Sequence, residues 1–242
     1  MVNSSQEKLI LPKSDSWQMF NAISPQYDQL NRLLSFNLDR GWRRSLGIWL
    51  PNRRKLQLLD LATGTGDVII SLLKRSPDIE AACGLDLADE MLKIAEQKVR
   101  AAHLSEKISL RHGDAQAIPY PDESFDVVTT AFGIRNMPVP EKVLAEMFRV
   151  LKKGGRVIIL EFSLPQNFIL RGLQLFYLRQ IIPLIGGAIS GNFQAYRYLN
   201  QTVEKFPYGE AFCELLEDAG FQIVSAQPLT FGIATIYKGD KI

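Results

Sequence analysis

The stretch LLDLATGTGDV, residues 58–68, predicts the element around which the chain is organised. Its apolar lead-in is typical of a buried parallel strand over 55–61, and a helix is expected from Asp67. Between them, Gly64 and Gly66 let the backbone turn sharply and let a ligand approach main-chain N–H groups. A helix N-terminus behind such a loop favours a nucleotide-like ligand. An ordinary strand-to-helix turn remains the alternative.

Strands and helices alternate around this stretch. Further strands are predicted over 81–86, 108–112, 125–131 and 156–162, and helices over 67–75, 88–101 and 139–150. Such alternation indicates an α/β fold with helices on both faces of a parallel sheet. After a helix over 208–219, strands over 221–226 and 231–237 lie too close in sequence for a parallel crossover. We therefore expect a seven-stranded, mostly parallel, Rossmann-like sheet whose last strand is antiparallel.

Length and composition limit the classes of protein to which the chain can belong. The chain has 242 residues, 46% of them hydrophobic, which suits a single domain with a sizeable core. A net charge of +2 without a basic stripe argues against a nucleic-acid binder. Its two cysteines suggest no metal cluster or disulfide framework. The start shows no signal-peptide pattern, and no uncharged apolar run reaches the roughly 18 residues of a spanning helix, so we expect a cytoplasmic protein.

Two helical segments stand outside the alternation. The first, over 14–50, is either an amphipathic cover for the sheet or a cap over an active site, in one or two pieces because Pro25 interrupts it. The second, over 164–207, contains a very apolar stretch at 168–189. That stretch is either an extra packed helix or a lid for an apolar substrate, and we expect it to be too interrupted to span a bilayer.

Three features fall at the carboxyl edge of the predicted sheet, where open α/β sheets bind ligands. Asp86 ends the second strand and can accept hydrogen bonds from a ribose diol, or it caps the next helix. Asp114 and Ala115 follow the third strand and can face an adenine ring. The loop lacks the third glycine of a dinucleotide fingerprint, and Asp67 would repel a pyrophosphate but suit a sulfonium. The combination predicts a site for S-adenosylmethionine.

Several further motifs carry a family resemblance. They are YDQLN at 27–31 with Ser35 and Trp42, FGIRN at 132–136, RVLKKGG at 149–155 with EFS at 161–163, AYRYL at 195–199, and the segment 235–241. On these motifs, nearly the whole chain from Trp17 onward resembles the UbiE/COQ5/MenG family of quinone C-methyltransferases. Departures from the family pattern are Leu30 for Met, Asp39 for His, Lys153 for Pro and Ala131 for Ser. Asp39 rules out a histidine role at its position, and the chain looks most like the phylloquinone-type branch.

The resemblance implies a class I S-adenosylmethionine-dependent methyltransferase. It implies methyl transfer to a ring carbon of a reduced prenylated naphthoquinone, demethylphylloquinol or demethylmenaquinol, with S-adenosylmethionine as donor and no metal. The residues that we assign to the donor are Ala62, Gly64, Thr65, Gly66, Asp86, Leu87, Asp114, Ala115 and Ala131.

Four residues are candidates for the acceptor side. Arg135 can stabilise a phenolate or orient a water that acts as base, and Asn136 can hydrogen-bond a ring oxygen. Tyr27 and Asp28 can close the site over the donor. The structural alternatives are a surface ion pair for Arg135, a turn residue for Asn136 and a core aromatic for Tyr27. For Glu161, the sequence does not separate a structural role from a substrate contact.

Other functions remain open at this stage. A methoxy-benzoquinol of ubiquinone synthesis is the alternative acceptor. A nicotinamide-dependent oxidoreductase and a non-catalytic subunit that organises quinone enzymes are alternatives of other classes. Because a prenylated quinol resides in lipid, we expect the protein to be peripheral to the membrane and to contact its surface transiently. The sequence leaves homodimer formation open.

Overall fold

A seven-stranded sheet forms the centre of the computed structural model, which describes residues 11–242. The strands are β1 (Leu56–Leu61), β2 (Ile79–Asp86), β3 (Ile108–His112), β4 (Phe125–Ala131), β5 (Leu151–Phe162), β6 (Gln222–Leu229) and β7 (Ala234–Asp240). They follow the order β3-β2-β1-β4-β5-β7-β6, and only β7 runs antiparallel to its neighbours. The predicted sheet is therefore confirmed. Residues 1–13 are largely polar, and the loose start that this composition predicts falls mostly outside the described range.

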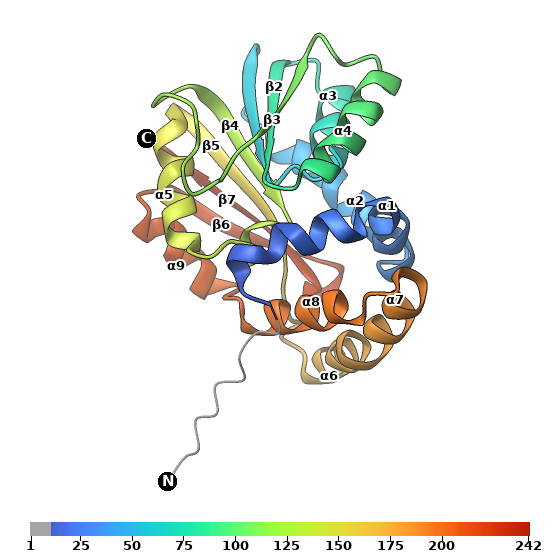
Figure 1. Cartoon of the computed structure of the whole chain (residues 1–242). Helices are drawn as coiled ribbons and strands as arrows, with labels where there is room; N and C mark the ends of the chain where they lie inside the picture. Colours follow the sequence, from blue (N-terminus) through green and yellow to red (C-terminus); the bar gives the residue numbers. More distant parts are fainter. Residues whose placement is uncertain (1–10) are drawn as a thin grey trace.

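Helices cover both faces of the sheet (Figure 1). α3 (Asp67–Arg75) and α4 (Asp89–Ala101) lie on one face, and α5 (Pro140–Val150) and α9 (Glu210–Asp218) on the other. Successive residues of a strand point to opposite faces, so Leu58 belongs to one core cluster and Leu59 to the other. Both faces are covered, so β1 and β4 are buried almost throughout, polar residues such as Asp60 and Thr129 included.

Several element boundaries differ from the prediction, most clearly at β5 and in the last hairpin. β5 begins at Leu151, five residues before the predicted 156, because Leu151 pairs with Phe125 ahead of a register shift. In the last hairpin the turn is Thr230–Gly232 rather than the segment after residue 226. Thr230, Phe231 and Gly232 have positive φ angles and reverse the chain. β6 can contain Pro228, which donates no backbone hydrogen bond, because this strand lies at the edge of the sheet.

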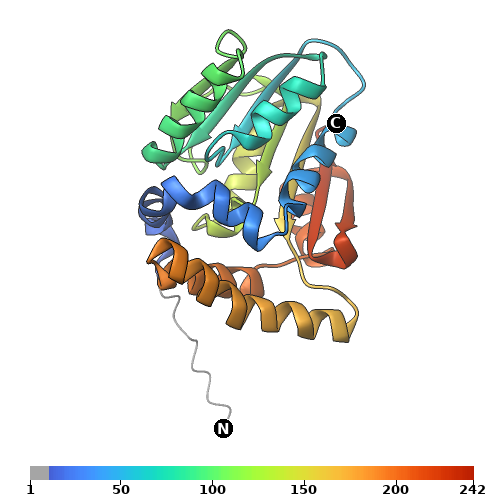
Figure 2. The same ribbon diagram turned by 90° about the vertical axis from the view of Figure 1, so that its right-hand side faces the viewer.

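The N-terminal segment forms η1 (Lys13–Asp15), α1 (Ser16–Leu34), α2 (Leu38–Ser45) and η2 (Leu46–Trp49). α1 is one continuous helix, so Pro25 does not divide it. It crosses the carboxyl edge of the sheet and contacts α2, α4 and α7 (Figures 1 and 2). The segment therefore lies where a cap would lie.

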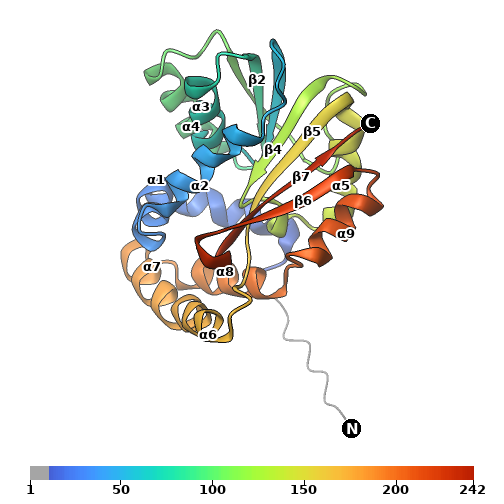
Figure 3. The same ribbon diagram turned by 180° about the vertical axis from the view of Figure 1, so that it is seen from behind.

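The apolar insertion follows β5. It contains α6 (Phe168–Phe176), the π-helical turn η4 (Tyr177–Ile181), α7 (Ile182–Ser190) and α8 (Phe193–Lys205). α6 begins where the Asn167 side chain accepts hydrogen bonds from the N–H groups of Ile169 and Leu170. α6 to α8 lie on the far side of α1 from the sheet (Figures 2 and 3).

We expected this stretch to be too interrupted to span a bilayer, but the structure shows no interruption. Phe168–Ser190 is one helical rod with a mean hydropathy of 1.3, long and apolar enough by length and composition alone to cross a membrane. Pro183 lacks an N–H group, and the preceding π turn accommodates it without ending the rod. Of its most apolar window, 17% is buried in the protein, so most of its surface faces outward.

Candidate functional site

Two cavities adjoin each other at the carboxyl edge of the sheet. We call them the donor cavity, of about 230 Å³, and the acceptor cavity, of about 330 Å³. The residues that line both are Phe20, Tyr27, Phe132 and Asn136. Beside these four residues, a group held in one cavity therefore lies next to a group held in the other.

The donor cavity is built on the loop after β1. Asp86 accepts hydrogen bonds from the N–H of Gly64 at 2.7 Å and from the N–H of Ala88 at 2.8 Å. Burial raises the pKa of Asp86, although these N–H groups oppose the rise. Each carboxylate oxygen keeps a free lone pair, which suits the paired hydroxyls of a ribose. The carboxylate and the loop are therefore locked into one unit at the sheet edge.

Most predicted donor residues line this cavity. They are Ala62, Gly64, Asp86, Leu87, Asp114, Ala115 and Ala131. Asp114 is held by the N–H of Gln116 at 2.8 Å. A Cβ atom at Gly133 would lie 2.6 Å from the Cβ of Ala62, so the loops after β1 and β4 approach each other only because this residue is glycine. No group of three or more possible metal ligands occurs within residues 11–242.

Thr65 and Gly66 line neither cavity. Thr65 donates a hydrogen bond of 2.7 Å to Asp28 on α1. Gly66 has a φ of +80° and packs against Ala95 of α4. These two residues shape the loop and attach it to the cap, and no contact places them at the donor.

The prediction that Asp67 attracts a sulfonium is wrong. The side chain lies outside both cavities and pairs with Arg32 at 3.0 Å and with Lys98. Burial alone would raise the pKa of Asp67, but Lys98 lowers it below its usual value. Because these cations neutralise it, Asp67 stabilises the cap rather than a sulfonium.

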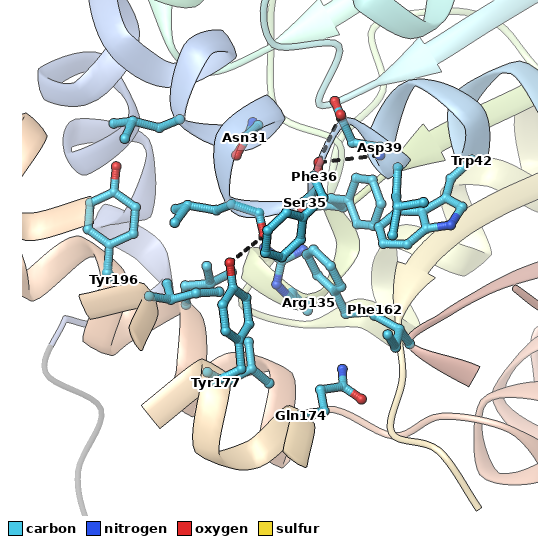
Figure 4. A pocket seen from close by; sticks show the side chains of 18 of the residues that line it. Asn31, Ser35, Phe36, Asp39, Trp42, Arg135, Phe162, Gln174, Tyr177 and Tyr196 are labelled. Carbon is cyan, nitrogen blue, oxygen red and sulfur yellow. Dashed lines mark hydrogen bonds between the residues drawn. The ribbon is translucent and has the colours of Figure 1, made fainter. Parts of the chain in front are cut away.

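The acceptor cavity lies between α1, α2 and the insertion (Figure 4). Its wall is mainly apolar and aromatic, with Leu30, Trp42, Phe162, Leu178 and Tyr196 among its members. The polar or charged side chains in it are few: Asn31, Ser35, Asp39, Arg43, Arg135, Asn136 and Gln174, besides the tyrosines. Such a lining suits a greasy molecule with a small polar head.

Arg135 lies in this wall and is not a surface residue. It is 5% exposed and donates to Glu161 at 2.7 Å and to the carbonyl of Phe132 at 2.6 Å. Its guanidinium lies 5.2 Å from the ring centroid of Phe162, and its Nε has no hydrogen-bond partner among the described residues. Glu161 lines neither cavity, so it holds Arg135 from behind.

Asn136 and Tyr27 occupy the shared wall. Asn136 donates to the carbonyl of Phe132 at 3.2 Å, and its Oδ1 is buried without a partner among residues 11–242. Burial raises the pKa of Tyr27, while the nearby Arg43 opposes the rise. Asp28 lines neither cavity and instead bonds Thr65 and Lys98. Of the four acceptor-side candidates, the structure brings three together.

The comparisons with known proteins agree with this geometry. The model of the ubiE/COQ5 methyltransferase family matches residues 10–241. The chain belongs to this family. It is 42% identical to the ubiquinone/menaquinone biosynthesis C-methyltransferase UbiE of Geotalea daltonii, over 93% of this chain and 95% of that protein. It is 45% identical to the demethylmenaquinone methyltransferase of Thermus thermophilus, over 92% of this chain and all of that protein.

Solved structures support the fold. A possible histamine N-methyltransferase of Thermotoga maritima is 20% identical with a TM-score of 0.67, covering 93% of this chain and 99% of its own. The [4+2]-cyclase SpnF is 15% identical with a TM-score of 0.68, covering 96% and 97%. These identities are low, so the likeness concerns the fold alone. With the family match, the chain is an S-adenosylmethionine-dependent C-methyltransferase of class I fold, and the nicotinamide and non-catalytic alternatives are dropped.

Sequence reasoning missed Phe132 and Arg43 in this methyltransferase. Phe132 directly follows β4 with a φ of +60°, lines both cavities and supplies the carbonyl that Arg135 and Asn136 share. It stands in the FGIRN motif, so the motif itself was a signal. Arg43 lies 5.3 Å from the Phe132 ring centroid, and no spacing rule pointed to it.

Proposed function

We propose that this methyltransferase methylates a ring carbon of a reduced prenylated naphthoquinone, a demethylmenaquinol or demethylphylloquinol. The observation that carries the proposal is the pair of cavities that meet at Phe132 and Tyr27. One presents Gly64 and Asp86 to an adenosyl donor, and the other offers an apolar chamber to an aromatic acceptor.

The chemistry makes modest demands on the enzyme. A quinol, most of all as its phenolate, donates electron density to a ring carbon, which then attacks the sulfonium methyl group in line. Holding both reactants in direct contact where the two cavities adjoin lowers the entropic cost of this encounter. The aromatic lining excludes water, which strengthens the attraction between phenolate and sulfonium.

Names of the relatives support a quinone acceptor. The Thermus thermophilus relative is named for demethylmenaquinone, a naphthoquinone, whereas the Geotalea daltonii relative is named for both ubiquinone and menaquinone synthesis. The benzoquinol of ubiquinone synthesis is therefore the second candidate acceptor.

A contact with the membrane surface is part of the proposal. Phe36, Leu173 and Phe231 line the acceptor cavity while 74%, 61% and 81% exposed, so its mouth is apolar. Phe168 and Phe176 extend this surface along α6. An exposed apolar patch of this kind suits a lipid surface, from which a prenyl tail can enter the cavity. The expected protein is cytoplasmic and peripheral to the membrane.

One assay distinguishes the two acceptors. Demethylmenaquinol and 2-polyprenyl-6-methoxy-benzoquinol with tails of the same length are kept reduced under argon and incubated with labelled S-adenosylmethionine. We expect kcat/KM for the naphthoquinol to exceed that for the benzoquinol at least tenfold. Equal values would contradict the naphthoquinol preference, and turnover of neither would contradict quinone methylation.

A further inference from the structure

We propose that Asp39 is the general base that takes the proton from the quinol hydroxyl before methyl transfer. This inference rests on the proposed function, because it concerns the same acceptor cavity. It gives Asp39 a chemical role of its own in place of the histidine that is usual at this position.

Asp39 is the one acidic side chain that lines the acceptor cavity among the residues that the structure describes. It lies in α2 and is 4% exposed, so water does not compete freely for its carboxylate. Glu161 is the other buried acid nearby, but its oxygens already accept from the side chain and the N–H of Arg135 and from the N–H of Phe162. Asp39 is therefore the carboxylate within reach of a bound quinol.

Hydrogen bonds hold the carboxylate in place and leave capacity for one more donor. Oδ1 accepts from the Ser35 hydroxyl at 2.9 Å, and Oδ2 pairs with the Arg43 guanidinium (Figure 4 shows the contact with Ser35). A carboxylate has about four lone-pair sites, so an incoming O–H group finds a free acceptor. Ser35 also lines the cavity and shields one side of the carboxylate.

Arg43 connects this base to the transfer point. Its guanidinium lies 5.3 Å from the centroid of Phe132, which forms part of the wall shared with the donor cavity. Once Asp39 is protonated, it no longer neutralises Arg43, and the cation is free to stabilise the new phenolate. Arg135 also lines the cavity, with its charge paired with Glu161.

The other groups that surround Asp39 are consistent with this role. The charged or titratable side chains that share the cavity are Tyr27 on α1, Arg43 on α2, Arg135 on η3 (Ile134–Asn136), and Tyr177, Tyr196 and Tyr198 from the insertion. Beneath α2, Arg43 also acts on the buried carboxyls of Asp60 and Asp67. Each of the two cations in the cavity wall has a carboxylate partner, Arg43 with Asp39 and Arg135 with Glu161, so protonation of Asp39 leaves Arg43 unpaired and favours an anion in the cavity.

The quinol O–H proton passes to Asp39, and the ring carbon forms a bond with the methyl group while the S–CH3 bond breaks and its electron pair stays on sulfur. The ring C–H proton then leaves to water, and its bonding pair restores the aromatic ring as a phenolate. Asp39 returns its proton to that phenolate, so one proton is released overall and the base is regenerated.

The first test is Asp39→Asn, which keeps the shape and the hydrogen bond to Ser35 but accepts no proton. We expect kcat to fall at least 100-fold at pH 7, and to recover about tenfold per pH unit as the free quinol, with a pKa near 10, ionises in solution. Asp39→Glu should restore part of kcat. A kcat within threefold of the parent, with an unchanged pH profile, would overturn the proposal.

The matched control is Asp240→Asn. Asp240 is also a mostly buried acid held by an arginine, Arg156, at 2.5 Å, but it lines neither cavity. Both variants lose a carboxylate beside an arginine, so both should lose stability. We normalise kcat to the amount of enzyme that still binds S-adenosylhomocysteine. This normalised kcat should fall in Asp39→Asn and stay unchanged in Asp240→Asn. Equal loss of kcat in both variants would overturn the specific role.

A second readout does not depend on turnover. A 3-alkyl-1-naphthol has one hydroxyl group and absorbs at longer wavelength as the naphtholate. When it binds at pH 7 in weak buffer, the parent enzyme should form the naphtholate without releasing a proton, because Asp39 keeps it, whereas any naphtholate bound to Asp39→Asn should release one proton to the buffer. Release of one proton per naphtholate by the parent enzyme would overturn the proposal. If the parent enzyme methylates no quinol at all, the proposed function fails instead, so the two failures are distinguishable.

Discussion

Asp28 on α1 accepts a hydrogen bond of 2.7 Å from the hydroxyl of Thr65 in the glycine loop. The same carboxylate pairs with Lys98 of α4 at 2.8 Å, and Lys98 also pairs with Asp67. These contacts join the cap, the loop and the helix behind it into one unit. The position of α1 over the donor cavity therefore depends on side chains that touch neither reactant.

Asp28→Ala tests this attachment. Removing the carboxylate leaves Thr65 and Lys98 without their shared partner and loosens α1 at the donor cavity, so the dissociation constant for S-adenosylhomocysteine should rise about 10-fold, equivalent to roughly 1.4 kcal/mol. Titration calorimetry measures it. As a control, Glu96→Ala removes an exposed i,i+4 pair with Arg100 and should leave binding unchanged. Unaltered affinity in Asp28→Ala would refute a role for the attachment.

The buried carboxyl group of Asp60 should make the free energy of unfolding depend on pH. Burial raises its pKa to about 6, although Thr129 at 2.6 Å and Thr63 at 2.7 Å donate to it and oppose the rise. The folded state thus binds the proton more tightly than the unfolded chain. The stability from this group is fully present below about pH 4 and is lost as the pH rises through 6.

The measurement is urea unfolding of the parent and of Asp60→Asn at several pH values. The difference in free energy of unfolding between them should change in favour of the variant by on the order of 2 kcal/mol between pH 4 and pH 7. A difference that stays constant over this range would show that Asp60 does not titrate as described.

Variants of the Arg135–Glu161 pair distinguish a role of Arg135 in stability from a role in catalysis. Arg135→Met leaves Glu161 buried without its cation, which should cost about 3–5 kcal/mol of stability. The double variant Arg135→Met/Glu161→Leu removes both charges and should regain most of that stability. Chemical denaturation measures the recovery.

Methyl transfer should not recover in the double variant, because Arg135 faces the acceptor cavity and Glu161 does not. Single-turnover kinetics with saturating quinol measure this step, and we expect a loss of at least 100-fold. If the stable double variant transfers methyl groups at the parent rate, Arg135 has a structural role only.

The apolar face of the insertion predicts dependence on lipid. Phe168 and Phe176 are 80% and 59% exposed and line neither cavity. Phe168→Ser/Phe176→Ser should abolish flotation with anionic liposomes and raise KM several-fold for a long-tailed quinol in vesicles. For a short-tailed quinol in solution, kcat/KM should not change. Parent-like flotation of the variant would exclude this face as the contact.

Sequence patterns predicted the sheet well because both of its faces are buried. Apolar runs such as the one ending at Leu61, and the glycine loop behind it, are local features that a sequence displays directly. The antiparallel β7 followed from the short connection before it, whereas the strand order was not predicted. Boundaries failed where pairing overrode propensity, as at Leu151 and Pro228.

The site was predicted less completely, for a physical reason. Residues that follow a strand meet at the sheet edge by topology, so Asp86 and Asp114 were found together. The acceptor cavity instead depends on how α2 and the insertion pack on that edge. Asp39 and Arg43 are brought together by their i,i+4 spacing in α2, but they meet Phe132 only through this packing, for which the sequence gives no periodic signal.

Asp67 illustrates the limit of reasoning from charge in sequence. Its position after Gly66 suggested attraction to a sulfonium, yet Arg32 and Lys98 occupy its oxygens. Those partners lie 35 and 31 positions away in the chain. A charge acts on a ligand only when no such partner is closer.

The donor cavity should hold S-adenosylmethionine and the acceptor cavity a reduced quinone, so that the two reactants meet beside Phe132 and Tyr27. A single anaerobic turnover with methyl-labelled S-adenosylmethionine and demethylmenaquinol, followed by extraction of the lipid, measures this reaction. We expect one labelled methyl group on a ring carbon of the quinol for each S-adenosylhomocysteine formed. Unlabelled quinol recovered from an enzyme that binds S-adenosylhomocysteine would contradict this arrangement.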